Sequence, residues 1–387
     1  EGKTHAICNC CGCGCLAIRN AIMYRNTDFS RSNYISVIDE EKCVACGECV
    51  ENCPTNALRL GQKICSSKPI PEEKTVKTPR DHRWGPEDWN PDYRTNRQVV
   101  VKTGTSPCKA NCPAHIGVQG YIKLAAQGKY REALELIKLE NPFPAVCGHV
   151  CPRYCEQGCS RLGLDEAVAV DDIKKFIAEQ DLNSAHRYVP KKKRDYHDKK
   201  IAIIGGGPAG LSCAYYLAID NYDVTVFEKE KSLGGMLKFG IPSFRLEKNV
   251  LDAEIDVLKE LGVNFKTGVE VGKDVSLDEL RAQGFKAFYL AIGAQKGRLL
   301  GIEGEDAAGV ITGVDFLREE NLNESKSLSG KVIVIGGGNV AIDVARMAVR
   351  AGGEEVSMFC LEKREEMPAL PEEIHEAEEE GIKITNS

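Results

Sequence analysis

The distribution of cysteines constrains this chain more than any other feature. Of its 18 cysteines, 16 lie within the first 159 of 387 residues, and only Cys213 and Cys360 follow. A secreted disulfide scaffold is usually short and spreads its cysteines through the fold. Here a cysteine-dense part precedes an ordinary α/β part, so the pattern favours thiolate ligands of metal over a disulfide framework.

One cysteine run matches the bacterial ferredoxin pattern C-x2-C-x2-C-x3-C-P. It consists of Cys43, Cys46, Cys49 and Cys53, followed by Pro54. Short spacings let one loop wrap a [4Fe-4S] cluster with three thiolates, while the fourth commonly reaches a second cluster. A structural zinc site, the alternative, usually pairs two C-x2-C knuckles across a longer gap. The run therefore predicts an iron–sulfur cluster.

A second, irregular run supplies five more thiols, namely Cys8, Cys10, Cys11, Cys13 and Cys15. In a two-cluster ferredoxin, Cys15 would complete the first cluster, and Cys53 would join three of the other four thiols in the second. The spacing departs from the ferredoxin run, so a surface thiol patch or a zinc knuckle stays open. Cys65 has no assigned role.

Two glycine-rich turns dominate the second half. Gly205-x-Gly207-x2-Gly210 follows a buried strand at 201–204 and precedes a helix, and Glu228 ends the next strand. The glycines allow a dinucleotide pyrophosphate to approach the backbone, and the acid accepts ribose hydroxyls. A similar turn with Gly336, Gly338 and Ala341 follows the strand 331–335. The pattern predicts two Rossmann-like units.

The chain is expected to be a multidomain protein with five parts. These are a ferredoxin-like [4Fe-4S] domain (1–65), an extended proline-rich linker (66–104), a small helical iron–sulfur domain (105–198), an FAD-binding Rossmann-like domain (199–328) and an incomplete NAD(P)-binding Rossmann-like domain (329–387). Apolar periodicity predicts helices at 121–126, 130–139 and 171–180. Because the start lacks a Met and the end falls inside the last domain, we expect a piece of a longer polypeptide.

Composition excludes several classes of protein. The formal net charge of −6 argues against nucleic acid or an anionic membrane as the main partner. No apolar run reaches the roughly 18 residues that cross a bilayer, and no signal-peptide pattern begins the chain. We therefore expect a cytoplasmic protein without membrane insertion.

The helical segment resembles a known family. It carries Cys108-x3-Cys112-Pro113, then the segment 141–152 with Cys147, His149 and Cys151, then Cys155 and Cys159. These residues resemble the N-terminal iron–sulfur domain of the glutamate synthase small subunit, of dihydropyrimidine dehydrogenase and of the large subunit of NADH-dependent ferredoxin:NADP oxidoreductase. Members of that family place two clusters beside the flavin.

This chain departs from the family pattern. The usual cysteine pair before Cys108 is absent, and Lys174-Lys175 stands where some members supply a Gln or Glu ligand. The six thiols are enough for one cluster, with Cys112, Cys151 and Cys155 as ligands and Cys108 or Cys159 as the fourth. His149 is expected at a helix end or behind the ligands, and Cys147 is unassigned. About three [4Fe-4S] clusters are expected in the chain.

The resemblance also covers the nucleotide domains, through Gly-Gly-Pro-Ala-Gly and the loop 234–245. It implies that FAD is lined by Gly205, Gly207, Pro208, Ala209, Gly210, Glu228, Lys229, Gly235, Met236, Arg245, Val271, Ala291 and Gly293. It implies a nicotinamide nucleotide at Gly336, Gly338, Asn339, Val340, Ala341 and Glu362. Leu361 and Glu362 replace two arginines that read the 2′-phosphate in the family, so NAD(H) is expected over NADP(H).

The resemblance and the cysteine pattern together imply a function. A redox disulfide would need a cysteine pair after the first Rossmann unit, and none lies between Cys213 and Cys360. We expect an enzyme that passes electrons between NAD(P)H, FAD and a [4Fe-4S] chain to a ferredoxin or partner redox subunit, within a larger complex of an anaerobic prokaryote, with electron bifurcation left open. No side chain is assigned as a catalytic acid or base. The alternatives are a relay or scaffold subunit with vestigial nucleotide sites and a zinc-stabilised redox sensor.

Overall fold

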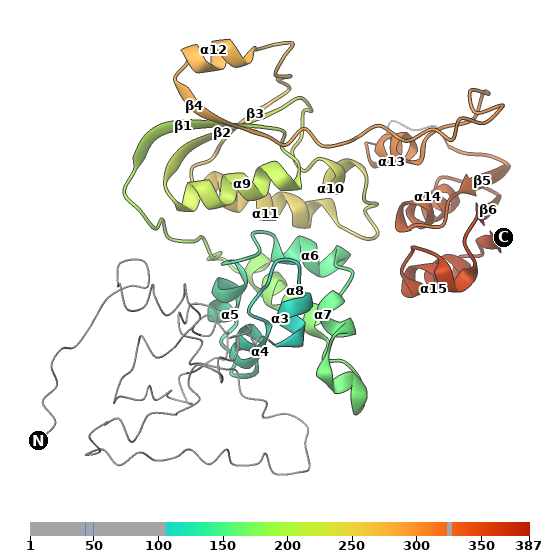
Figure 1. Ribbon diagram of the computed structural model, residues 1–387, viewed down its shortest axis with the longest axis horizontal. Helices are drawn as coiled ribbons and strands as arrows, with labels where there is room; N and C mark the ends of the chain where they lie inside the picture. The colour runs from blue at the N-terminus through green and yellow to red at the C-terminus, as the bar shows by residue number, and fades with distance from the viewer. Residues whose placement is uncertain (1–42, 44–48, 50–105, 323–326) are drawn as a thin grey trace, which may run out of the picture. The chain divides into compact units, whose positions relative to one another are not determined.

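The computed structural model describes residues 43, 49, 106–322 and 327–387 (Figure 1). The predicted ligands Cys8, Cys10, Cys11, Cys13, Cys15, Cys46 and Cys53, and the predicted linker 66–104, lie outside the described residues. The described chain contributes to two compact units. The first holds residues 106–141 and 153–173, and the second holds 142–152 and the chain from 174 onward.

The first unit is helical. Its elements are α3 (Pro107–Asn111), α4 (Val118–Ala126), α5 (Tyr130–Ile137), α7 (Tyr154–Gln157) and the 3-10 turn η3 (Ser160–Gly163). The expected helices at 121–126 and 130–139 are confirmed as α4 and α5, although α4 begins three residues earlier and α5 ends at Ile137. Tyr121, Leu134 and Ile137 are buried, because the apolar stripes of α4 and α5 face each other.

Two further helices complete the segment between residues 142 and 182. The helix α6 (Pro144–Val150) belongs to the second unit, and α8 (Val170–Leu182) begins in the first unit and ends in the second. Asp171 and Asp172 occupy the first turn of α8, where negative charge favours a helix N-terminus. The expected helix at 171–180 is therefore confirmed with slightly wider bounds.

A four-stranded parallel sheet forms the centre of residues 197–290, which we call the first Rossmann half. Its order is β3-β2-β1-β4, and its strands are β1 (His197–Ile204), β2 (Tyr222–Glu228), β3 (Asn264–Thr267) and β4 (Phe285–Leu290). Its helices are α9 (Pro208–Ile219), α10 (Met236–Phe239), α11 (Lys248–Glu260) and α12 (Leu277–Ala282). In Figure 1, α9 and α11 lie on one face of the sheet and α12 on the other.

Helices on both faces explain why the strand at 201–204 is apolar at every position. Ile201 to Ile204 are all buried. Ile203 packs in a core with Leu211, Val226 and Leu258, whereas Ala202 packs with residues that include Leu280 of α12. The carboxyl ends of β1, β2 and β4 therefore meet at one edge of a rigid sheet, directly before the glycine turn.

A three-stranded parallel sheet organises residues 331–386, which we call the second Rossmann half. Its order is β5-β6-β7, with strands β5 (Lys331–Ile335), β6 (Glu355–Cys360) and β7 (Lys383–Asn386). The helices are α14 (Asn339–Arg350) and α15 (Pro371–Glu379), with the 3-10 turn η4 (Arg364–Glu366) between them, while α13 (Gly313–Asn321) precedes the half. Ile342, Met358 and Ala377 form its core, so the predicted second strand–turn–helix unit is confirmed. Within the described residues, no helix has the length and apolar character of a membrane span.

Candidate nucleotide and iron–sulfur sites

Two glycines of the first turn are required by packing within the protein. Gly205 has φ +111°, and a Cβ there would lie 2.2 Å from the carbonyl oxygen of Ala291. A Cβ on Gly210 would lie 1.9 Å from the carbonyl oxygen of Gly205. Only glycine permits these approaches, which press the start of α9 onto the ends of β1 and β4.

The middle glycine of the turn has no such reason. Gly207 has the extended backbone that any residue adopts, with φ −81° and ψ −176°. A Cβ there would meet only Gly235 Cα, at 3.8 Å. Pro208 begins α9, and the helix N-terminus has no side-chain cap. The space beside Gly207 and the uncapped helix end suit the pyrophosphate of a dinucleotide, so this turn fits FAD.

Glu228 ends β2 beside this turn, and it is 5% exposed. Its Oε2 accepts a hydrogen bond from the backbone N–H of Gly206 at 2.6 Å, and its Oε1 accepts one from Glu230 N–H at 2.9 Å. The two backbone donors fix the carboxylate, and each oxygen retains a lone pair for a further donor. The predicted ribose acceptor is therefore preformed.

The other residues expected around FAD come from the first Rossmann half and from the segment directly after it. Lys229 and Met236 line a pocket of about 240 Å³ together with Phe239, Gln295 and Arg318, among others. A Cβ on Gly235 would lie 2.8 Å from Gly207 Cα, which brings the loop after β2 onto the glycine turn. The predicted contacts of Ala209, Val271, Ala291 and Gly293 with FAD stay predictions.

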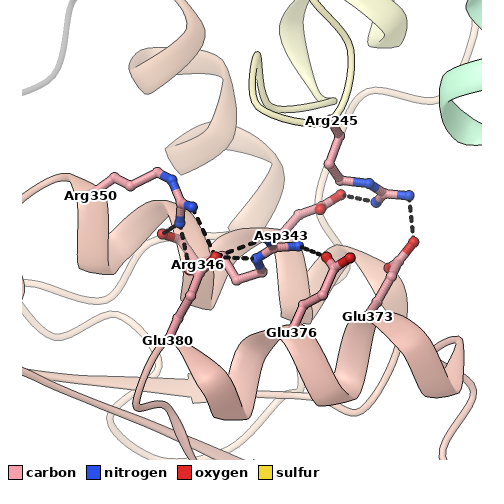
Figure 2. Close-up of polar contacts among 7 residues, drawn as sticks. All are labelled: Arg245, Asp343, Arg346, Arg350, Glu373, Glu376 and Glu380. Carbon is pink, nitrogen blue, oxygen red and sulfur yellow. Dashed lines mark hydrogen bonds and ion pairs between the residues drawn. The ribbon is translucent and has the colours of Figure 1, made fainter.

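Arg245 has a different set of partners from the one that the family resemblance implies. Its guanidinium pairs with Asp343 of α14 at 2.7 Å and with Glu373 of α15 at 2.5 Å (Figure 2). Both acids lie in the second Rossmann half. A contact of Arg245 with FAD stays a prediction, and the structure shows an ion-pair role that sequence reasoning missed.

The second glycine turn repeats the arrangement of the first. Gly336 has φ +137°, and its N–H donates to Phe359 C=O at 2.9 Å, as Gly205 N–H donates to Phe227 C=O at 2.8 Å. A Cβ on Gly338 would meet no atom within 4 Å. The turn therefore has room for a second dinucleotide. Asn339, however, accepts a hydrogen bond from Leu370 N–H at 2.8 Å, which gives it a local structural role.

In the second half, the carboxylate beside the glycine turn belongs to Glu362, which lies beyond the end of β6. Since Phe359 matches Phe227, Cys360 stands where Glu228 stands in the first half. The carboxylate of Glu362 nevertheless fills the equivalent place. A Cβ on Gly337 would lie 3.0 Å from Glu362 Oε2, as one on Gly206 would lie 3.1 Å from Glu228 Oε2.

Asn386 fixes the turn that carries Glu362. Its Nδ2 donates to the backbone carbonyl of Glu362 at 2.9 Å and lies 3.2 Å from Cys360 Sγ. Sequence reasoning missed Cys360 and Asn386 at this site. Counting from the glycine turns does not find Cys360, because Glu228 lies 23 residues after Gly205 (228 − 205) whereas Cys360 lies 24 residues after Gly336 (360 − 336).

Four of the predicted cluster ligands lie in the first unit, all of them cysteines. Cys108 lies in α3, Cys112 follows that helix, Cys155 lies in α7, and Cys159 precedes η3. Cys108, Cys112 and Cys159 are free thiols. An all-thiolate donor set suits a [4Fe-4S] cluster. Among the residues that the structure describes, however, no three His, Cys, Asp or Glu side chains form a preorganised metal site.

Three of these thiols act electrostatically on the buried hydroxyl of Tyr121. Its pKa is raised by burial, and further by the negative charges of Cys155, Asp171, Cys108 and Cys112. A Cβ on Gly158, directly after α7, would clash with Asn111 of α3. Helix α3 and the end of α7 are therefore closely packed, and the assignment of Cys112, Cys151 and Cys155 as ligands, with Cys108 or Cys159 as the fourth, stays a prediction.

The predicted ligand Cys151 lies in a different unit, near the unassigned Cys147 and His149. Cys147 and Cys151 lie in the second unit, where α6 carries Cys147 and ends before Cys151. His149 Nδ1 lies 2.9 Å from the carbonyl oxygen of Ala145, and its Nε2 lies 3.9 Å from Glu179. These partners support the expectation that His149 is a helix-end residue. Of the N-terminal thiols, Cys43 and Cys49 are described.

Three family models match the chain. The pyridine nucleotide-disulphide oxidoreductase model matches residues 199–386, the model of dihydropyrimidine dehydrogenase domain II with its 4Fe-4S cluster matches 95–186, and the 4Fe-4S binding domain matches 36–59. The matches follow the predicted order of two iron–sulfur domains before the nucleotide domains.

Curated relatives agree with this arrangement. The β subunit of an NADPH-Fe(3+) oxidoreductase from Geobacter sulfurreducens is 41% identical, over 72% of this chain and 42% of the relative. The β subunit of an NADP(+)-dependent formate dehydrogenase from Moorella thermoacetica is 40% identical, over 72% and 42%. The glutamate synthase [NADPH] small chain of Escherichia coli is 36% identical, over 73% and 62%. The chain thus spans less than two thirds of each of these relatives.

The two glycine turns, the buried acid and the iron–sulfur domains define a class, the FAD- and NAD(P)-linked oxidoreductases with [4Fe-4S] clusters. Within this class, the chain belongs to the iron–sulfur flavoprotein family that includes the glutamate synthase small chain and the β subunits named above. FAD and [4Fe-4S] clusters are the cofactors of these domains.

Proposed function

We propose that this chain passes electrons between a nicotinamide nucleotide, FAD and [4Fe-4S] clusters to a ferredoxin or partner redox subunit. The observation that carries the proposal is the pair of glycine turns that leave space at Gly207 and Gly338, each with an acid against it. Bound FAD accepts a hydride as an electron pair and returns electrons one at a time. The chain binds and orients both nucleotides, while its thiolates hold the clusters.

The positions of the cysteines support the proposed electron outlet. A flavin of this fold can also pass electrons to a redox disulfide. Cys213 and Cys360 are the only cysteines after Cys159, and they lie in α9 and β6 of separate Rossmann halves. Cluster ligands therefore offer the outlet. Membership of a larger complex is supported by the relatives, several of which are named as subunits.

The proposed nucleotide is NADH. Glu362 brings a carboxylate to the glycine turn of the second half as Glu228 does in the first. An acid in this position accepts the 2′- and 3′-hydroxyls of a ribose and repels a 2′-phosphate. The three relatives described above are named for NADPH or NADP(+), so this preference would set the chain apart from them.

We also propose a cytoplasmic location in an anaerobic prokaryote, because oxygen attacks exposed [4Fe-4S] clusters. The competing function is an electron relay whose nucleotide sites are vestigial. The preformed carboxylate of Glu228 and the open glycine turns argue against it.

A diaphorase assay separates the two functions. The chain, prepared without air and supplied with FAD, is mixed with NADH and an artificial acceptor such as a viologen. We expect catalytic reduction of the acceptor that requires FAD. A chain that binds FAD and clusters but gives no NADH-dependent reduction would be a relay, and the proposal would be wrong.

A further inference from the structure

One loop of the first Rossmann half makes two adjacent contacts with the second half (Figure 2). Arg245 Nη1 donates to Asp343 Oδ2 at 2.7 Å, and Nη2 donates to Glu373 Oε1 at 2.5 Å. Asp343 and Glu373 come from different helices, α14 and α15. A single guanidinium therefore joins both helices to the loop between α10 and α11.

The preceding residue extends the contact. The ring of Phe244 lies 4.7 Å from the guanidinium carbon of Arg346 and 4.1 Å from that of Arg350, in cation–π geometry. Both arginines pair with Glu380, and Arg346 also pairs with Glu376 (Figure 2). Phe244 thus lies on an ion-pair network that is internal to the second half, and Arg245 adds the charged link between the halves.

The charges of Arg245 and its two partners do not balance, because two carboxylates face one guanidinium. Asp343 and Glu373 are 5% and 8% exposed, and one arginine pairs with both. Asp343 Oδ1 and Glu373 Oε2 are buried and have no hydrogen-bond partner. Leaving buried carboxylate oxygens unsatisfied is costly, so the pair is expected to hold a proton.

Electrostatics around the pair agree with this expectation. Burial raises the pKa of Asp343 and of Glu373, and Asp343 raises that of Glu373 further, while Arg245 opposes both shifts. The other charges that face the pair are Arg346 of α14, Lys248 of α11 and Glu376 of α15. With one proton, the acids and Arg245 form a neutral group.

We propose that Arg245 is a positioning residue that holds the second Rossmann half against the first for hydride transfer. This inference rests on the proposed function. A hydride moves only between closely approached atoms, and a misplacement of about 1 Å can cost about a hundredfold in rate. The junction between the halves is therefore expected to control the rate of hydride transfer through the geometry that it holds.

Two measurements on the FAD-loaded chain test the proposal. The first is the limiting rate of flavin reduction by NADH in anaerobic stopped flow, with the Kd for NADH. We expect Arg245→Gln to lower the rate in the FAD-loaded chain by about tenfold or more with the Kd for NADH retained, and Arg245→Lys to restore part of it. Asp252→Asn is the matched control, because Asp252 pairs with Lys238 at 2.6 Å within the first half.

The second measurement is hydrogen–deuterium exchange of the same variants without NADH. We expect faster exchange in Arg245→Gln at residues 242–246 and in the first turn of α15, with α12 unchanged. A wild-type rate or wild-type exchange in Arg245→Gln would overturn the inference. No flavin reduction by NADH in the wild-type chain would instead overturn the proposed function.

Discussion

Glu228 accepts a hydrogen bond from the backbone N–H of Gly206, with 2.6 Å between Oε2 and N. The acid ends β2, and the glycine belongs to the turn after β1, so the bond joins the two elements that meet a dinucleotide. Because the carboxylate is buried and already oriented, binding of a ribose requires little rearrangement there.

Exchanging Glu228 for Gln tests this orientation. The amide keeps one acceptor but presents an N–H₂ group toward a backbone donor and the ribose, so charge-assisted hydrogen bonds are lost. We expect a loss of about 1.5–3 kcal/mol in FAD binding, which corresponds to roughly tenfold to a hundredfold in Kd. Fluorescence titration of FAD measures it. Exposed Glu270→Gln is the control, and equal FAD affinity in both variants would show that Glu228 is a spectator.

Two glycine substitutions should change different properties. Gly210→Ala should lower the stability of the fold, and Gly338→Ala should weaken the binding of NADH. Gly210→Ala places a methyl group 1.9 Å from a backbone oxygen, so we expect a fall of a few kcal/mol in the free energy of unfolding. Gly338→Ala meets no protein atom within 4 Å, so stability should be unchanged while NADH binding weakens, because the methyl group fills the phosphate space. Thermal melts and NADH titrations separate the two. Unaltered NADH affinity in Gly338→Ala would contradict the assignment of the second turn.

The iron content tests the ligand assignments. With two clusters from the N-terminal cysteines and one from the helical segment, we expect about twelve irons per chain. Cys155→Ser should remove roughly four of them, whereas Cys213→Ser, in a helix of the first Rossmann half, should remove none. Iron analysis after anaerobic purification measures both. About four irons in the wild-type chain would eliminate the two-cluster N-terminal domain.

The preference for NADH depends on Glu362. In NADPH, the 2′-phosphate would meet this carboxylate, and we expect at least about tenfold discrimination from the repulsion and the missing arginine fork. Lys363 and Arg364 oppose the effect in part, although Arg364 is engaged by Glu378. Leu361→Arg with Glu362→Arg should move the preference toward NADPH. Equal kcat/KM for both nucleotides in the wild-type chain would contradict the assignment.

Local pattern was sufficient to predict much of this architecture. The strand at 201–204, the turn after it and Glu228 lie within one βαβ unit, so their spacing alone indicated the site. Cys360 was missed as the counterpart of Glu228, because the family resemblance identified Leu361 and Glu362 as the residues that replace two arginines. The pairing of Ile335 with Phe359 places Cys360 at the position equivalent to Glu228. The carboxylate beside the second glycine turn comes instead from Glu362.

Long-range pairing could not be predicted in this way. Arg245 lies 98 residues from Asp343 and 128 from Glu373, and no periodicity relates an arginine in a loop to acids on two later helices. The contact depends on how the two Rossmann halves pack. The same reason limits the helical segment, since the packing of α3 on α7 joins parts of the chain that lie far apart in the sequence.

Freeze-quench spectroscopy of the anaerobic chain with NADH tests the central claim most directly. The claim predicts that flavin absorbance bleaches first and that the electron paramagnetic resonance signal of reduced [4Fe-4S] clusters follows, with NADH faster than NADPH. Bleaching without a cluster signal would contradict the proposed electron outlet. No bleaching with either nucleotide, in a chain that retains FAD, would contradict the assignment of the second Rossmann half.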